Sequence, residues 1–212
     1  MKAPAKAEPR GHDWSRKSDA TADVCIIVEG CYPFVPGGVS GWIDWLIRTQ
    51  PDRTFSIVSL WPSPTEIPAR YAMPDNAISF HPLYLQDYGR RPRSWRLQHP
   101  PLEKVAAQLA QLMARGGVEC LTRLMAELSV VSRAIPVSRL FNSEAAWEVV
   151  CQMYQGRMPY GSFLHYFWAW RALLGGLFAC LEFELPKARA YHTISTGYAG
   201  VLAARARLET GR

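Results

Sequence analysis

The chain has 212 residues, of which 49% are hydrophobic and 20% are charged, a balance that excludes a disordered protein. The formal net charge of +6 is spread along the sequence and forms no basic face with interleaved aromatic residues, which excludes a typical nucleic-acid binder. The five cysteines have no zinc-binding spacing, so we expect reduced, packed thiols and no metal site.

The first residues are polar and contain no apolar core of a secretory signal. We therefore expect residues 1–20 to form a disordered tail, residues 21–212 to form one domain, and the protein to be cytoplasmic. The most apolar segment runs from Tyr160 to Phe183, but Arg171 interrupts it and Glu182 closes it. This pattern favours a buried helix over a transmembrane span.

A strand, a helix and a second strand are predicted at the start of the domain. The continuous apolar run from Asp23 to Gly30 predicts a strand that is buried on both faces. Apolar residues then recur at helical spacing and predict one packed stripe: Val39, Trp42, Ile43, Leu46 and Ile47. A second buried strand over Arg53–Trp61 completes the βαβ unit of a parallel sheet.

Helices are predicted between this unit and a final strand and helix. A strand is expected over 77–85, followed by a helical block over 101–132 and by helices over 143–155, with Ser143 as N-cap, and over 162–181. A strand over 188–196 and a helix over 197–211 end the chain. The order predicts an α/β fold, a Rossmann-like parallel sheet with a helical insertion at about 100–183.

The loop between the first strand and its helix is the clearest candidate ligand site. In open α/β sheets, ligands bind outside the carboxyl ends of the strands. Gly37 and Gly38 lack Cβ atoms and can adopt positive φ, and the following helix directs its free N–H groups at the same place. The loop therefore suits a phosphate. A tight turn without a ligand is the alternative, since the spacing matches neither GxGxxG nor a P-loop.

Four segments carry a more specific signal: EGCYPFVPGGVSGWIDWLI (29–47), SEAAWEVVCQMY (143–154), SFLHYFWAWRALLGGLF (162–178) and YHTISTGYAGVLAARARLETGR (191–212). In this order they resemble the N-terminal domain of the PelF family, the Pel-polysaccharide glycosyltransferases, which are GT-B enzymes similar to glycosyltransferase family 4. The resemblance covers almost the whole chain beyond the tail. It implies the N-terminal half of a GT-B architecture, in which two Rossmann-like domains face each other across a cleft.

The resemblance implies site residues at the ends of two strands. The residues expected at the donor diphosphate are Gly37, Gly38, Val39 and Ser40, the last two through backbone amides. Glu29 and Tyr32 are expected beside the cleft, although Glu29 equally fits a carboxylate exposed to water. Hydroxyls and a glycine after the last strand fit recognition of sugar hydroxyls, or a helix cap provided by Thr196: Ser195, Thr196 and Gly197.

Two other features are less specific. Arg171 lies within an apolar helix, where a guanidinium needs an acidic or phosphate partner, so it either pairs with an internal acid or faces the cleft. His192 is expected to pack within its strand. The aromatic residues of the insertion fit core packing better than a platform for a sugar chain.

The chain ends where its relatives continue. In those relatives another strand, a linker and a C-terminal domain follow, and that domain holds most of the nucleotide-sugar site. We therefore expect a partial product that lacks the donor pocket and does not catalyse transfer by itself. We also expect the edge of the sheet to be left unpaired.

Two functions follow from the resemblance. The first is the N-terminal portion of an enzyme that transfers a hexosyl group from a UDP-sugar to a growing glycan in exopolysaccharide biosynthesis. The expected partners are then the nucleotide sugar and the glycan acceptor, with no metal or cofactor besides the UDP-sugar co-substrate. The alternative is a non-catalytic docking module that binds inner-membrane components of the Pel synthase through the aromatic insertion, which would place the protein peripherally at that membrane.

Overall fold

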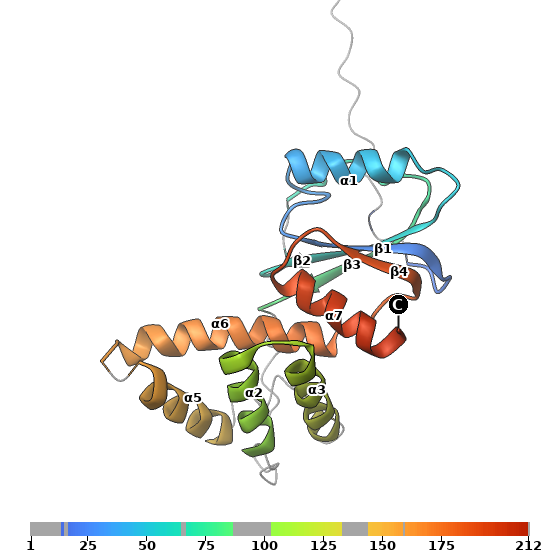
Figure 1. Ribbon diagram of the computed structural model, residues 1–212. Helices are drawn as coiled ribbons and strands as arrows, with labels where there is room; N and C mark the ends of the chain where they lie inside the picture. Colours follow the sequence, from blue (N-terminus) through green and yellow to red (C-terminus); the bar gives the residue numbers. More distant parts are fainter. Residues whose placement is uncertain are drawn as a thin grey trace, which may run out of the picture. The chain divides into compact units, whose positions relative to one another are not determined.

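Four strands form a parallel sheet with the order β3-β2-β1-β4 (Figure 1). They span Ala22–Glu29 (β1), Phe55–Trp61 (β2), Ala77–Tyr84 (β3) and Ala188–Thr193 (β4). Strand β1 runs parallel to β2 and β4, with Val24 opposite Phe55 and Ala22 opposite Ala188. This computed structural model describes residue 14 and residues 17–64, 67–86, 103–132, 144–158 and 160–211. The predicted Rossmann-like α/β fold is confirmed.

The chain divides into two compact units. The sheet unit contains the strands, helix α1 (Gly38–Arg48) and most of helix α7 (Tyr198–Thr210). The helical unit contains α2 (Glu103–Arg115), α3 (Val118–Ser132), α5 (Glu144–Arg157) and α6 (Phe163–Glu182). These four helices come between β3 and β4 in the sequence. The N-cap predicted at Ser143 lies outside the described residues.

The two central strands are largely buried because most of their residues are apolar. All seven residues of β2 are buried, as are four consecutive residues of β1, Cys25–Val28. The polar side chains among them have hydrogen-bond partners: the Ser56 and Ser79 hydroxyls share a bond of 2.7 Å, and Ser59 Oγ donates to Tyr32 O at 2.8 Å. Burial raises the pKa of the Cys25 thiol to about 12.

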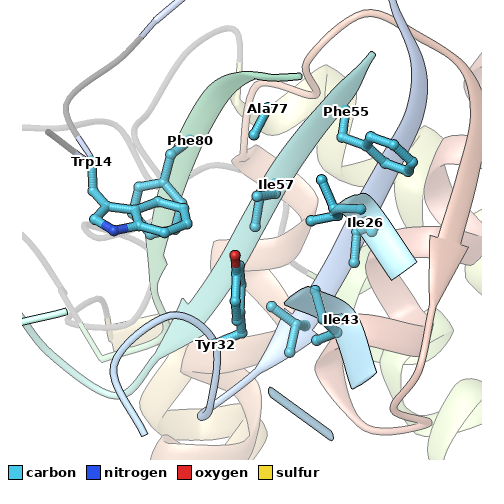
Figure 2. Close-up of a cluster of buried hydrophobic side chains, with 10 residues drawn as sticks. Trp14, Ile26, Tyr32, Ile43, Phe55, Ile57, Ala77 and Phe80 are labelled. Atoms are coloured by element: carbon cyan, nitrogen blue, oxygen red, sulfur yellow. The ribbon is translucent and has the colours of Figure 1, made fainter. Parts of the chain in front are cut away.

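Helix α1 covers one face of the sheet and builds the core shown in Figure 2. Its sheet-facing stripe is Ser40, Ile43 and Ile47, and Ile43 packs with Ile26 and Ile57 of the two central strands. The C-terminal end of α1 is held by Asn76, whose Nδ2 donates to Ile47 O at 2.9 Å. These contacts fix the helix, and hence its N-terminus, relative to the strand ends.

Trp14 belongs to this core although it lies in the predicted disordered tail. Its ring makes edge-to-face contacts with Tyr32 and Phe80, at centroid distances of 5.4 and 5.1 Å (Figure 2). Its Nε1 donates to Tyr71 O at 3.0 Å. The expectation of a tail without a place in the fold is therefore wrong for this residue, whereas residues 1–13, 15 and 16 lie outside the described part.

The helical unit contains α6, the most apolar of the helices that the structure describes. Ser162 precedes it as N-cap, and its side chain accepts from the N–H of His165 at 3.5 Å. Trp170 is buried in this unit, and its Nε1 donates to the Met153 sulfur of α5 at 3.4 Å. Within the described residues, neither α6 nor any other helix has the length and hydropathy needed to cross a bilayer.

Candidate functional site

The carboxyl ends of β1 and β4 form a topological switch point. The helix that follows β1 and the helix that follows β4 lie on opposite sides of the strands (Figure 1). Pairing of Ile27 with Thr193 brings the end of β1, at Glu29, to the level of the loop after β4. Open α/β sheets bind ligands at such points, so the N-termini of α1 and α7 are the candidate ligand sites.

The N-terminus of α1 has no side-chain cap. Gly37 is the N-cap residue, and the first turn contains no acidic residue. The N–H of Gly41 donates to Gly37 O at 2.8 Å, so the amides of the three preceding helical residues have no acceptor within the helix: Gly38, Val39 and Ser40. These amides and the helix dipole together favour an anion.

The two glycines keep this helix end open. A Cβ atom at Gly37 or Gly38 would meet no other atom within 4 Å, so no other part of the protein fills the space beside these two Cα atoms. Gly37 has a φ of 166°, which is extended backbone that any residue adopts. Positive φ, which the sequence suggested as a use for these glycines, is therefore not what they provide. Their contribution is the close approach that a missing side chain allows.

Ser40 takes part through its backbone only. Its side chain is buried, and Oγ donates to Val35 O at 2.6 Å, which ties the loop to the first turn of α1. The hydroxyl is therefore already bonded, while the amide remains one of the three at the helix end. The predicted contact of the Val39 and Ser40 amides with a donor diphosphate stays a prediction.

The N-terminus of α7, in contrast, holds a carboxylate. Glu29 Oε2 accepts from the N–H of Ala199 at 3.3 Å. The N–H of Val201 donates to Gly197 O at 3.2 Å, which makes Gly197 the N-cap residue. A Cβ atom at Gly197 would lie 2.8 Å from Glu29 Oε2 and 3.2 Å from Oε1. Glu29 thus fills the position that an N-cap side chain or a bound anion would take.

Residues 22–212 match the family model described as a domain of unknown function, DUF3492. The chain is a member of the DUF3492 family. Neither the curated proteins nor the solved structures gave a match. The switch point of this DUF3492 domain brings together Glu29 of β1 and Gly197 of the loop after β4, two of the residues predicted from the sequence.

The other residues of the loop after β4 remain accessible. Ser195 is half-buried, and its carbonyl accepts from Thr193 Oγ1 at 2.7 Å, while Thr196 and Gly197 are exposed. Thr196 was one predicted cap for this helix, but Glu29 caps α7 instead. The Thr196 hydroxyl therefore lies at the surface of the DUF3492 domain, where a ligand can reach it.

The structure places Tyr32 in the core and not beside a cleft. Its side chain is fully buried, its hydroxyl donates to Asp44 Oδ1 at 3.1 Å, and its ring packs against Trp14 and Tyr71. Burial, with the Asp44 carboxylate nearby, raises the pKa of the Tyr32 phenol. The Tyr32 ring packs in the core and stabilises the loop. Because its hydroxyl is already hydrogen-bonded, Tyr32 has no free group for a ligand.

Arg171 lies on α6 in the helical unit, where its side chain is half-buried. Its expected part in the site stays a prediction. The described part of the chain contains no group of three His, Cys, Asp or Glu side chains arranged to hold a metal ion.

Sequence reasoning missed one exposed pair in the sheet unit of the DUF3492 domain. Trp42 and His192 were expected to pack inside, yet Trp42 is 42% exposed and His192 is exposed as well. Their rings lie 6.1 Å apart, inclined at 37°. The apolar stripe of α1 that contains Trp42 is wider than the part of the helix that the sheet covers. This width can be read from the sequence and could have indicated that one edge of the stripe is exposed.

Proposed function

We propose that this DUF3492 domain is the acceptor-side, N-terminal half of a GT-B glycosyltransferase of the PelF type. In the complete enzyme, a hexosyl group would pass from a UDP-sugar to a growing glycan. The observation that carries the proposal is the open N-terminus of α1 at the switch point, with three unpaired helical amides behind two glycines. The resemblance of four sequence segments to the PelF family supports it.

The role of this helix end is electrostatic. Cleavage of a UDP-sugar leaves a diphosphate, and amides already directed at the leaving oxygen stabilise its developing charge without reorganisation. Gly37 and Gly38 would let the phosphate approach the backbone, and the helix dipole would add to the attraction. Transfer of this kind needs no protein-bound metal and no cofactor other than the co-substrate. The protein would act in the cytoplasm.

Equilibrium dialysis with radiolabelled UDP-glucose and UDP-N-acetylglucosamine tests this proposal. We expect weak binding that excess inorganic pyrophosphate displaces, and no sugar transfer by the 212-residue chain alone. Gly38→Asp places a carboxylate in front of the amides and should abolish binding. The proposal is contradicted if Gly38→Asp still binds the UDP-sugar, or if pyrophosphate does not displace the UDP-sugar from the unchanged protein.

A second function is favoured by the surface of the helical unit. Trp147 of α5 and Leu164 and Trp168 of α6 are large apolar side chains that are more than half exposed. Such residues mark protein interfaces, which fits a docking module for membrane components of a polysaccharide synthase. Trp168→Glu would then prevent co-purification with a co-expressed synthase component and leave UDP-sugar binding unchanged.

A further inference from the structure

One side of α1 is apolar and is not covered by the sheet. Val39 and Trp42 are 43% and 42% exposed, while the stripe that faces the sheet is made by Ser40, Ile43 and Ile47. Positions three and four residues apart lie on the same side of a helix, so Val39 and Trp42 form a neighbouring stripe. The Trp42 contact with His192 shows that this stripe faces β4.

Strand β4 presents two exposed residues to the same side. Ala190 pairs with Val24 and His192 pairs with Ile26, and Ile26 belongs to the core under α1. Ala190 and His192 therefore lie on the face of the sheet that α1 covers, beyond the edge of the helix. Together with the α1 stripe they form what we call the Trp42 ledge: Val39, Trp42, Ala190 and His192.

The chemistry of the ledge suits a hexopyranose ring. None of its four side chains is acidic or is a lysine or arginine, its surface is an indole ring beside an imidazole, and the imidazole offers polar nitrogens at the edge. A pyranose has one face of C–H groups and a rim of hydroxyls, so it can stack on the indole and hydrogen-bond to the rim. Sites for small ligands combine apolar surface with a few placed polar groups in this way.

The position of the ledge matches the length of a sugar phosphate. Trp42 follows Gly38 by four residues, about one helical turn or roughly 5 to 6 Å along the axis. Side chains on a helix lean toward its N-terminus, which carries the indole toward the free amides. A hexose linked to a phosphate at those amides therefore falls within reach of the ring.

We propose that the Trp42 ledge binds a hexopyranose ring next to the anion site at the N-terminus of α1. The inference rests on the proposed function, since that function supplies the phosphate at Gly37 and Gly38. The ring belongs either to the nucleotide sugar or to the glycan. Trp42 is the stacking surface, and His192 supports the indole and bonds to hydroxyls.

Saturation-transfer NMR with three probes tests the ledge: UDP-glucose, neutral maltohexaose and inorganic pyrophosphate. In Trp42→Ala we expect binding of the hexose-bearing probe to weaken about five- to tenfold, with saturation of its ring protons lost. Trp42→Phe keeps an aromatic face and should retain most of the affinity, whereas Trp42→Leu, which keeps only apolar area, should not. Trp45→Ala removes an indole that is 59% exposed on the same helix but lies about one turn farther from the free amides than Trp42, so it should have no effect.

The probes separate the possible results. A loss confined to UDP-glucose assigns the ring to the donor, and a loss that includes maltohexaose assigns it to the glycan; both support the ledge. Three results would overturn the proposed hexose site. Wild type and Trp42→Ala could bind the hexose probes equally, Trp42→Leu could retain as much affinity as Trp42→Phe, or wild type could bind neither hexose probe. Pyrophosphate reports on the proposed function separately, because Trp42→Ala should leave its binding unchanged. Matching circular dichroism and melting temperatures would show that the variants are folded.

Discussion

The N-termini of α1 and α7 present the same backbone chemistry at the same edge of the sheet, yet only one of them is available to a ligand. At α1 there is no capping side chain and no acidic residue, and the two glycines face open space. At α7 the Glu29 carboxylate accepts from the N–H of Ala199 and lies against Gly197. A phosphate would meet free amides at the first helix and a negative charge at the second.

A residue at a strand end determines which of the two helix N-termini keeps uncapped amides. Glu29 belongs to neither helix: it ends β1, and its hydrogen-bond partner Ala199 is 170 residues away in sequence. By satisfying α7, this single side chain leaves α1 as the helix end of the two whose first amides have no capping carboxylate.

Gly197→Ala should give one of the two largest losses of stability. Its Cβ would lie 2.8 Å from Glu29 Oε2, so the flexible carboxylate has to move away from the Ala199 N–H, and loss of such a cap costs about 0.5–2 kcal/mol of unfolding free energy. Denaturant titration monitored by circular dichroism measures this loss of unfolding free energy.

Gly38→Ala is the matched control at the other helix. Nothing lies within 4 Å of the added Cβ, and alanine is the better helix former, so its stability should be unchanged or raised by up to about 1 kcal/mol. Equal losses in the two variants would show that the two helix ends do not differ as described.

Replacement of Glu29 tests the cap itself. Glu29→Ala removes the acceptor for the Ala199 N–H, and loss of a helix cap costs about 0.5–2 kcal/mol. Glu29→Gln keeps an acceptor oxygen and loses only the charge, so it should be destabilised less. Thermal melts of both variants provide the comparison, and an alanine variant as stable as wild type would show that Glu29 does not stabilise α7.

An acidic residue placed on α1 should make that helix end resemble the end of α7. Val39→Glu introduces a carboxylate in the first turn, which should stabilise the helix by about 0.3–1 kcal/mol and prevent pyrophosphate from binding. Calorimetric titration and a denaturation curve on the same sample test both effects.

Trp45→Glu is the control for this charge change. It adds the same charge to the same helix beyond the first turn, where the effect of the dipole is small. If Val39→Glu and Trp45→Glu reduce pyrophosphate binding equally, net charge and not the helix end governs the interaction.

The sequence predicted the elements whose signal is local. The apolar run of β1, the helical spacing of α1 and the buried β2 were sufficient for the βαβ unit and the Rossmann-like fold. The Gly-Gly loop at the strand end was enough to locate the open helix terminus. In each case the pattern comes from residues close in the chain, and burial on both faces leaves few alternatives.

The features that the sequence did not predict depend on contacts between distant segments. Trp14 is a single aromatic residue in a polar stretch, and its burial depends on Tyr32, Tyr71 and Phe80. The pairing of Glu29 with α7 depends on the register between β1 and β4. Neither contact produces a periodic pattern of apolar residues in the sequence.

The most direct test of the central claim is a titration with inorganic pyrophosphate followed by amide chemical shifts in the ¹⁵N-labelled chain. We expect the amides of Gly38, Val39 and Ser40 to shift with a common saturation curve, while those of Tyr198, Ala199 and Gly200 do not respond. Shifts centred on the N-terminus of α7, or no saturable shift at α1, would contradict it.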